Sequence, residues 1–194
     1  MKGGTAKITS KKNVISDKAN IRINKCWNTI RFIAEHEYFA ANFLQVVEET
    51  LLPLFEYLVA PSNIDFDDDI MFCLTSLMKK SKVVSPTLRK IFPYLPQFQI
   101  KYKGIFGNLL QTINSYLMYG KDFFESSVEN LSQIFSMAIM SMCRQEEPLM
   151  LSNNMEGALL FHMALQNLDG PLIKDAIGDI LTNAHSRLKT MPMS

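Results

Sequence analysis

The hydrophobic residues of this chain recur every three or four positions over most of its length, which is the spacing of one face of an α-helix. The pattern is clearest between residues 65 and 120, where it predicts three helices in succession. An aspartate-rich turn starts the first near Asp65, Ser85-Pro86 starts the second, and Gly104 precedes the third. Short connections therefore join consecutive helices, as in helical hairpins.

The same period continues on both sides of this stretch. It predicts two helices at about 18–34 and 41–60 and three more at about 123–142, 153–169 and 171–188. The apolar stripe of the next-to-last helix comprises Met155, Ala158, Leu159, Met163 and Ala164. Glycine and proline are sparse, at 8 residues each, which disfavours an all-β fold with many tight turns. The predicted fold class is therefore all-α.

The predicted helices form about four antiparallel pairs, which begin near residues 18, 65, 104 and 153. Their average spacing of about 45 residues lies in the range of HEAT-like repeats. Prolines occur inside the second helix of two pairs: we expect Pro53 to bend its helix, and Pro93 and Pro96 to kink theirs or to end it early. These features favour a HEAT-like α-solenoid, and the alternative is a compact irregular helical bundle.

Composition divides the chain into three parts. Residues 1–17 are polar and basic, so we expect a flexible N-terminal arm; residues 18–189 hold the predicted solenoid, and residues 190–194 are expected to fray. The sequence contains no run of about 18 apolar residues, so we expect no membrane span. The three cysteines are widely separated and predict no disulfide framework, which favours an intracellular protein.

Charge is segregated along the chain, although the net charge is only +1. Residues 32–78 hold nine acidic residues and no Lys or Arg, whereas residues 79–121 hold eight basic residues and no acidic ones. Blocks of this kind predict charged patches on the surface, which mainly steer partners. The alternative is that they are ordinary solvated faces.

The acidic block supplies the candidate binding residues. We predict that they gather on one rim and attract a basic protein partner; they are Glu48, Glu49, Glu56, Asp65, Asp67, Asp68 and Asp69. An equally simple interpretation is that the aspartates only cap a helix, because carboxylates stabilise a helix N-terminus. The basic block lacks the interleaved exposed aromatic residues of single-strand binders, so we expect no direct contact with nucleic acid.

Motifs of catalysis and of ligand binding are absent from the sequence. His36 lies between Glu35 and Glu37 without a second histidine four residues on, and the other two histidines, His162 and His185, are isolated. Neither a nucleophile elbow nor a glycine-rich phosphate loop occurs. We therefore predict no metal, no cofactor and no catalytic residues, and an enzyme is the least favoured class.

Four segments resemble a known family. They are DFDDDIMFCLTSLMKKSKVVSPTLRKIFPYLPQF at 65–98, GIFGNLLQTINSYLMYGKDFF at 104–124, LSQIF at 131–135 and EGALLF at 156–161. Together they are similar to the C-terminal HEAT-repeat region of importin-beta-type nuclear transport receptors (karyopherins), nearest the branch that imports ribosomal proteins and histones. The likeness covers about residues 19–188.

The resemblance implies a superhelical arch that carries basic cargo, a ribosomal protein or a histone, and shuttles between cytoplasm and nucleus. It also implies contacts with nucleoporins and, for a full-length family member, control by the GTPase Ran, whose binding repeats lie at the N-terminal end of longer chains. The expected function is that of a receptor fragment or short form. The alternative is a generic helical-repeat scaffold for protein–protein interaction in another assembly.

Overall fold

The computed structural model describes residues 25–26, 28–33, 35–36, 45–50, 52–53, 67–101, 107–142, 151–171, 173–175, 177–178 and 182. Within these ranges the regular structure is entirely helical, which confirms the all-α prediction. The elements are α3 (Asp67–Ser81), α4 (Pro86–Ile91), the 3-10 turn η1 (Phe92–Tyr94), α5 (Leu95–Lys101), α6 (Gly107–Tyr119), α7 (Lys121–Glu125), α8 (Val128–Met142) and α9 (Leu151–Asn167). The predicted arm at 1–17 and tail at 190–194 lie outside the described residues.

The start of α4 follows the local signal in the sequence. The Ser85 hydroxyl accepts a hydrogen bond from the Leu88 amide at 3.2 Å, and Pro86 occupies the first helical position. The predicted bend is also present, because the chain tightens into η1 at Phe92–Tyr94 before continuing as α5. Pro93 cannot donate a backbone hydrogen bond, which explains why the regular α-helix is interrupted there.

The short helix α7 was not anticipated, because the sequence pattern runs on from Phe123 and Phe124 into the next stripe. In the structure α7 ends at Glu125, and α8 begins anew at Val128. The Ser127 hydroxyl accepts from the Asn130 amide at 3.3 Å, which caps the new helix.

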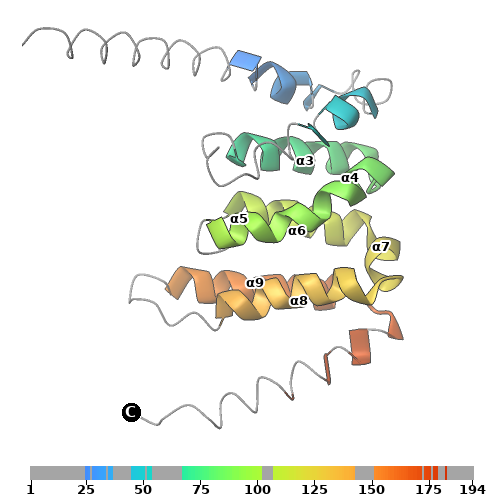
Figure 1. Cartoon of the computed structure of the whole chain (residues 1–194), viewed down its shortest axis with the longest axis vertical. Coiled ribbons are helices and arrows are strands. Elements are labelled where there is room, and N and C mark those ends of the chain that lie inside the picture. Colours follow the sequence, from blue (N-terminus) through green and yellow to red (C-terminus); the bar gives the residue numbers. More distant parts are fainter. Residues whose placement is uncertain are drawn as a thin grey trace, which may run out of the picture.

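The helices lie in two layers (Figure 1). The first layer comprises α3, α6 and α9, which run in the same direction, with α6 in contact with both α3 and α9. The second layer comprises the return helices, namely α4 with η1 and α5, followed by α8. A hydrogen bond of 3.3 Å from Gln133 of α8 to the Pro93 carbonyl links neighbours within the second layer.

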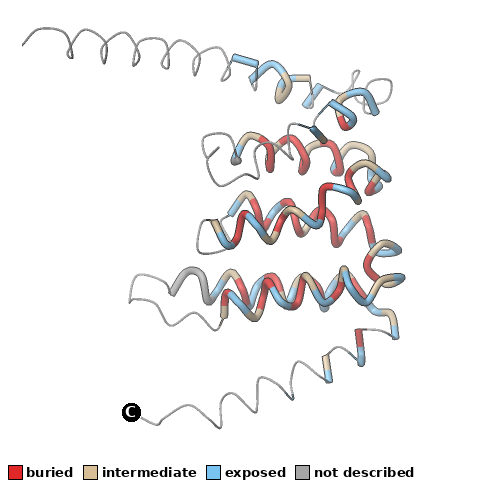
Figure 2. The backbone as a smooth tube through the Cα atoms, viewed as in Figure 1, coloured by how far each residue is buried: buried red, intermediate tan, exposed pale blue. Residues whose placement is uncertain are grey.

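The core runs between the layers, and buried residues recur along each helix from α3 to α9 (Figure 2). Phe92 is fully buried at the bend, and its ring lies 5.4 Å from that of Tyr116, 5.5 Å from Phe123 and 5.1 Å from Phe124 between centroids. The Tyr116 hydroxyl donates to the Leu88 carbonyl at 2.7 Å. One aromatic cluster thus joins α4, α6 and α7.

Buried polar side chains tie neighbouring helices together. The Thr112 hydroxyl of α6 lies 3.0 Å from the Met71 carbonyl of α3, to which it donates, and 3.0 Å from the Thr75 hydroxyl. The buried Gln99 amide of α5 donates to the Met137 carbonyl at 2.7 Å and to Ser141 at 2.8 Å, both in α8. Because such bonds need defined partners, they fix the register of adjacent helices.

Candidate protein-interaction surface

The structure places Glu48 inside the protein and not on a rim. Only 2% of the residue is exposed, and its Oε2 accepts a hydrogen bond from the Ser85 hydroxyl that also caps α4. The other carboxylate oxygen, Oε1, is buried without a hydrogen-bond partner among the described residues. The prediction that Glu48 faces a partner is therefore corrected: this side chain connects the helical residues 45–50 to the start of α4.

Burial raises the pKa of the Glu48 carboxyl above its ordinary value of 4.5, the Ser85 hydrogen bond opposes that rise, and Glu49 adds to it. The folded protein therefore binds the Glu48 proton more tightly than the unfolded chain does. The contribution of Glu48 to stability is therefore greatest in acid, and it falls as the pH rises through the raised pKa.

Replacing Glu48 by glutamine should remove this loss of stability at higher pH, because glutamine does not ionise. We expect Glu48→Gln to raise the free energy of unfolding at neutral pH by about 1 kcal/mol, because a neutral amide is buried at lower cost and still accepts from Ser85. The difference should vanish below pH 4.5, where the carboxyl is protonated in both states. Urea denaturation across this pH range measures the effect.

The neighbouring residue provides the control. Glu49 is exposed and accepts a hydrogen bond from the exposed Gln45 at 2.8 Å, so Glu49→Gln should change stability by less than about 0.5 kcal/mol. Equal effects of the two substitutions would contradict the buried position of Glu48.

The other acidic candidates lie elsewhere. Asp68 is exposed and its Oδ1 accepts from the Asn108 amide of α6 at 2.9 Å, while Asp69 is half-buried beside it in α3. Glu56 and Asp65 fall outside the described residues, and so does the side chain of Asp67.

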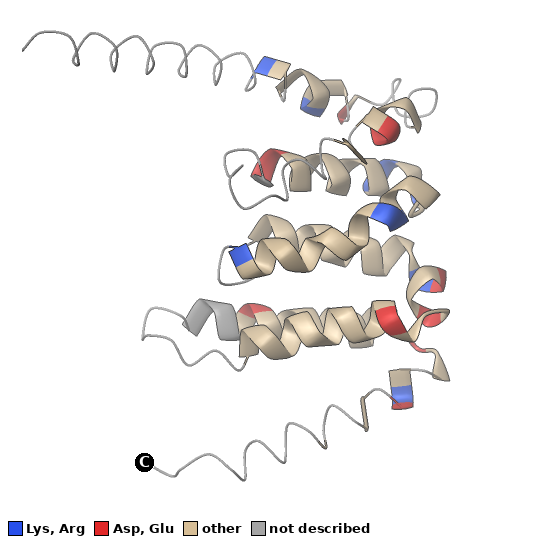
Figure 3. Ribbon diagram, in the orientation of Figure 1, with Lys and Arg blue, Asp and Glu red and all other residues tan. Residues whose placement is uncertain are grey.

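The acidic set is split between the two ends of α3. Asp68 lies at its beginning, and Glu48 lies at Ser85, just beyond its end; a helix of 15 residues is about 20 Å long. Figure 3 shows acidic residues at these two separate places. The single rim predicted from the sequence is therefore not formed by these residues.

Basic residues collect at the end of α3 and on α4. Lys79, Lys82 and Lys90 are exposed there. Arg89 pairs with Asp122 of α7 at 2.7 Å, and this hydrogen bond lowers the pKa of the Asp122 carboxyl. Basic and acidic residues of the two sequence blocks therefore lie close together near the end of α3, where Glu48 reaches Ser85.

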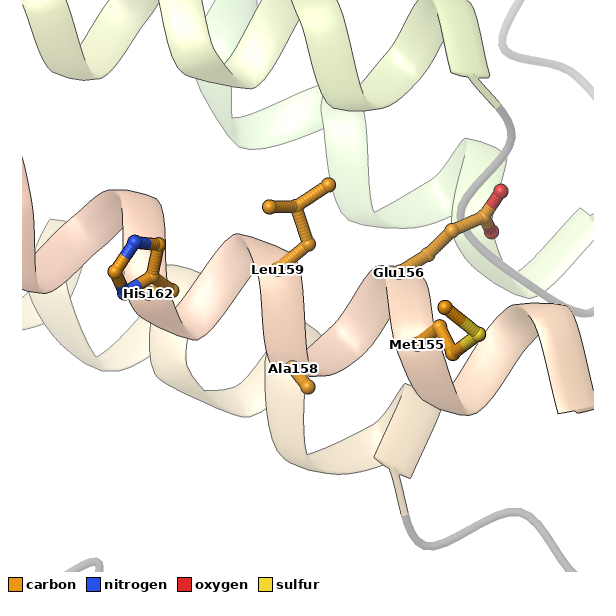
Figure 4. A pocket seen from close by; sticks show the side chains of 5 residues that line it. All are labelled: Met155, Glu156, Ala158, Leu159 and His162. Atoms are coloured by element: carbon orange, nitrogen blue, oxygen red, sulfur yellow. The ribbon is translucent and has the colours of Figure 1, made fainter.

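A hollow of about 630 Å³ lies on α9 and was not anticipated from the sequence. Its described lining comes from one helix: Met155, Glu156, Ala158, Leu159 and His162 (Figure 4). Leu159 and the Glu156 carboxylate extend from the same side of α9, toward the neighbouring helices. Oε2 of Glu156 is buried and has no hydrogen-bond partner in the described part of the chain, and burial raises the pKa of this carboxyl.

The predicted stripe of this helix was therefore partly wrong. The residues of α9 that face the core are Gly157, Leu160 and Ala164, while 73% of Met155 and 43% of Leu159 are exposed. The helix carries two apolar stripes, and the sequence alone does not say which one is covered. The one sign of an exposed apolar stripe in the sequence is that α9 has more apolar residues than a single buried stripe needs.

Other reactive groups do not converge in the part of the chain that the structure describes. In the residues that it describes, no three His, Cys, Asp or Glu side chains lie close enough together to hold a metal ion. Cys73 is buried in α3, and burial raises the pKa of its thiol to about 12. Such a thiol is a poor nucleophile at neutral pH.

None of the described helices combines the length and hydropathy required to cross a bilayer. Comparison with family models, with characterised proteins and with solved structures gave no match.

Proposed function

We propose that this chain is a HEAT-like helical-repeat scaffold that binds other proteins along its first layer. One observation carries the proposal: α3, α6 and α9 pack side by side in the same direction, and the return helices form a second layer. A stack in which each hairpin contacts mainly its neighbours is the principle of α-solenoids, which use their extended surfaces for binding.

We further propose that the partner is a basic protein, as expected for a receptor fragment or short form that imports ribosomal proteins or histones. The parallel direction of the first layer supports this, because it brings the beginnings of α3 and α9 to one side of the molecule. There α3 has acidic residues in its first turn and α9 has Glu156 in its second turn (Figure 3). Asp68 is exposed and Glu156 borders the hollow on α9. Negative charge along one edge attracts a positively charged partner and accelerates its association.

Binding of purified core histones tests this proposal. We expect Asp68→Lys to weaken binding about tenfold, because it reverses an exposed charge at the acidic edge, and we expect higher salt to weaken wild-type binding. Titration of the labelled protein at two ionic strengths measures both effects.

Glu129→Lys provides the matched control, since Glu129 is an exposed acidic residue in the first turn of α8, in the second layer. It should leave histone binding unchanged. Equal weakening by the two substitutions, or preferential binding of acidic proteins, would argue against a basic cargo and favour the alternative of a general scaffold in another assembly.

A further inference from the structure

The exposed faces of α8 and α9 differ in how their apolar residues are spaced. The exposed stripe of α8 is polar in its middle, at Ser132 and Ser136, and its two apolar residues, Val128 and Met140, lie at opposite ends of the helix. The exposed face of α9 instead presents Met155, Leu159 and Leu165, which are 73%, 43% and 39% exposed. An exposed apolar surface bordered by polar groups is typical of an interaction site.

Glu156 gives this face a chemical preference. Its Oε2 is buried at the wall of the hollow and, among the described residues, accepts no hydrogen bond. Burial is what raises the pKa of this carboxyl, and no cation among the described residues opposes that rise. A buried acceptor without a donor costs free energy, and a partner that supplies a charged donor recovers it.

We propose that the face of α9 formed by Met155, Glu156, Leu159 and His162 binds a segment of another protein that presents an apolar side chain next to a lysine or arginine. This site rests on the proposed scaffold function and specifies where and how one partner segment is held. The apolar side chain packs against Met155 and Leu159, and the cation donates to Glu156.

The dimensions and charge of the hollow support this occupant. A volume of about 630 Å³ lies within the range of about 300–1,000 Å³ that is usual for binding pockets. The described lining combines three apolar residues with one carboxylate and one histidine, so it offers an apolar surface and a single anionic anchor. A second copy of the chain would bring the same carboxylate to this face, and like charges disfavour that pairing.

Two labelled peptides test the proposal. One is a short helical peptide with leucine and arginine on one face, and the other has glutamate in place of each arginine. We expect wild-type protein to bind the leucine–arginine peptide at least tenfold more tightly, measured by fluorescence anisotropy at physiological ionic strength. Glu156→Gln should reduce this preference to less than threefold, and Met155→Asn should weaken binding of both peptides at least fivefold.

Two substitutions on α8 serve as matched controls. Glu129→Gln repeats the loss of a carboxylate, and Met140→Asn repeats the loss of an exposed methionine, since 42% of Met140 is exposed. Both should leave peptide binding unchanged, and circular dichroism should show the same helix content in all four variants. Equal affinity for the two peptides, or equal effects of the α8 and α9 substitutions, would overturn the proposal.

Two further outcomes would also overturn the site. One is a loss of self-association in Met155→Asn, which would identify a second copy as the occupant. The other is histone binding that Asp68→Lys weakens but no α9 substitution affects, in which case the proposed function stands and only this site fails.

Discussion

Replacing Phe92 by alanine should lower the free energy of unfolding by about 3–5 kcal/mol, the usual cost of removing a buried phenylalanine. The ring is fully buried and lies between the rings of Tyr116, Phe123 and Phe124, with centroids 5.1–5.5 Å away. Phe92 is also the first residue of η1, where Pro93 has already removed a backbone hydrogen bond. Because side-chain packing has to hold this bend in place, we expect that the neighbouring side chains will not move to fill the cavity that the missing ring leaves. Urea denaturation followed by circular dichroism measures the loss.

Phe32→Ala is the matched control, because 66% of Phe32 is exposed in the helical segment at 28–33. It should change stability by about 0.5 kcal/mol or less. If Phe92→Ala were as mild as Phe32→Ala, the aromatic cluster could not be what joins α4, α6 and α7.

Gly157→Ala should lower the free energy of unfolding by about 2 kcal/mol, because a new methyl group meets immovable backbone. A Cβ at Gly157 would lie 2.7 Å from the Ala138 carbonyl oxygen and 2.9 Å from the Met142 nitrogen. It would also lie 2.8 Å from the Ser141 Cβ. The methyl group can therefore be accommodated only if α8 and α9 move apart, which outweighs the gain of about 1 kcal/mol in helix propensity.

Gly107→Ala is the corresponding control at the start of α6, where a Cβ would meet nothing within 4 Å. Stability should stay the same or rise by up to about 1 kcal/mol. Thermal and urea denaturation measure the stability of the two variants. If Gly157→Ala left stability unchanged, α8 and α9 would not approach each other as closely as the structure shows.

The helices of this fold were predictable where the signal is local. Ser85-Pro86 marks the start of α4 because the serine caps the helix and the proline suits its first position, both within four residues. The bend near Pro93 follows from the missing backbone donor, again without any distant residue. The all-α class follows from the period of the apolar residues alone.

The placement of individual side chains depends on contacts between residues far apart in the sequence. The spacing of apolar residues gives no information about such contacts. Glu48 is buried because Ser85, 37 positions later, holds its carboxylate. The choice between the two apolar stripes of α9 is made by α8, which approaches Gly157 and covers only one of them. The acidic block was predicted as one rim because its residues are close in sequence, but the length of α3 separates them.

The proposed binding surface therefore lies at other residues than the sequence predicted, but it is still acidic. The acidic residues that remain exposed or half-buried on the first layer, Asp68, Asp69 and Glu156, lie toward the N-terminal ends of their helices. Beside Glu156, α9 adds an apolar face that the acidic block does not have. A partner would therefore be recognised by charge at α3 and by charge together with apolar contact at α9.

Hydroxyl-radical footprinting of the histone complex tests the binding layer most directly, because exposed methionines are readily oxidised and report their own accessibility. Met155 on α9 and Met140 on α8 are 73% and 42% exposed, so both are reactive in the free protein. Binding along the first layer predicts that histones protect Met155 several-fold and leave Met140 unchanged. Protection of Met140 alone, or of neither methionine in a saturated complex, would contradict the account.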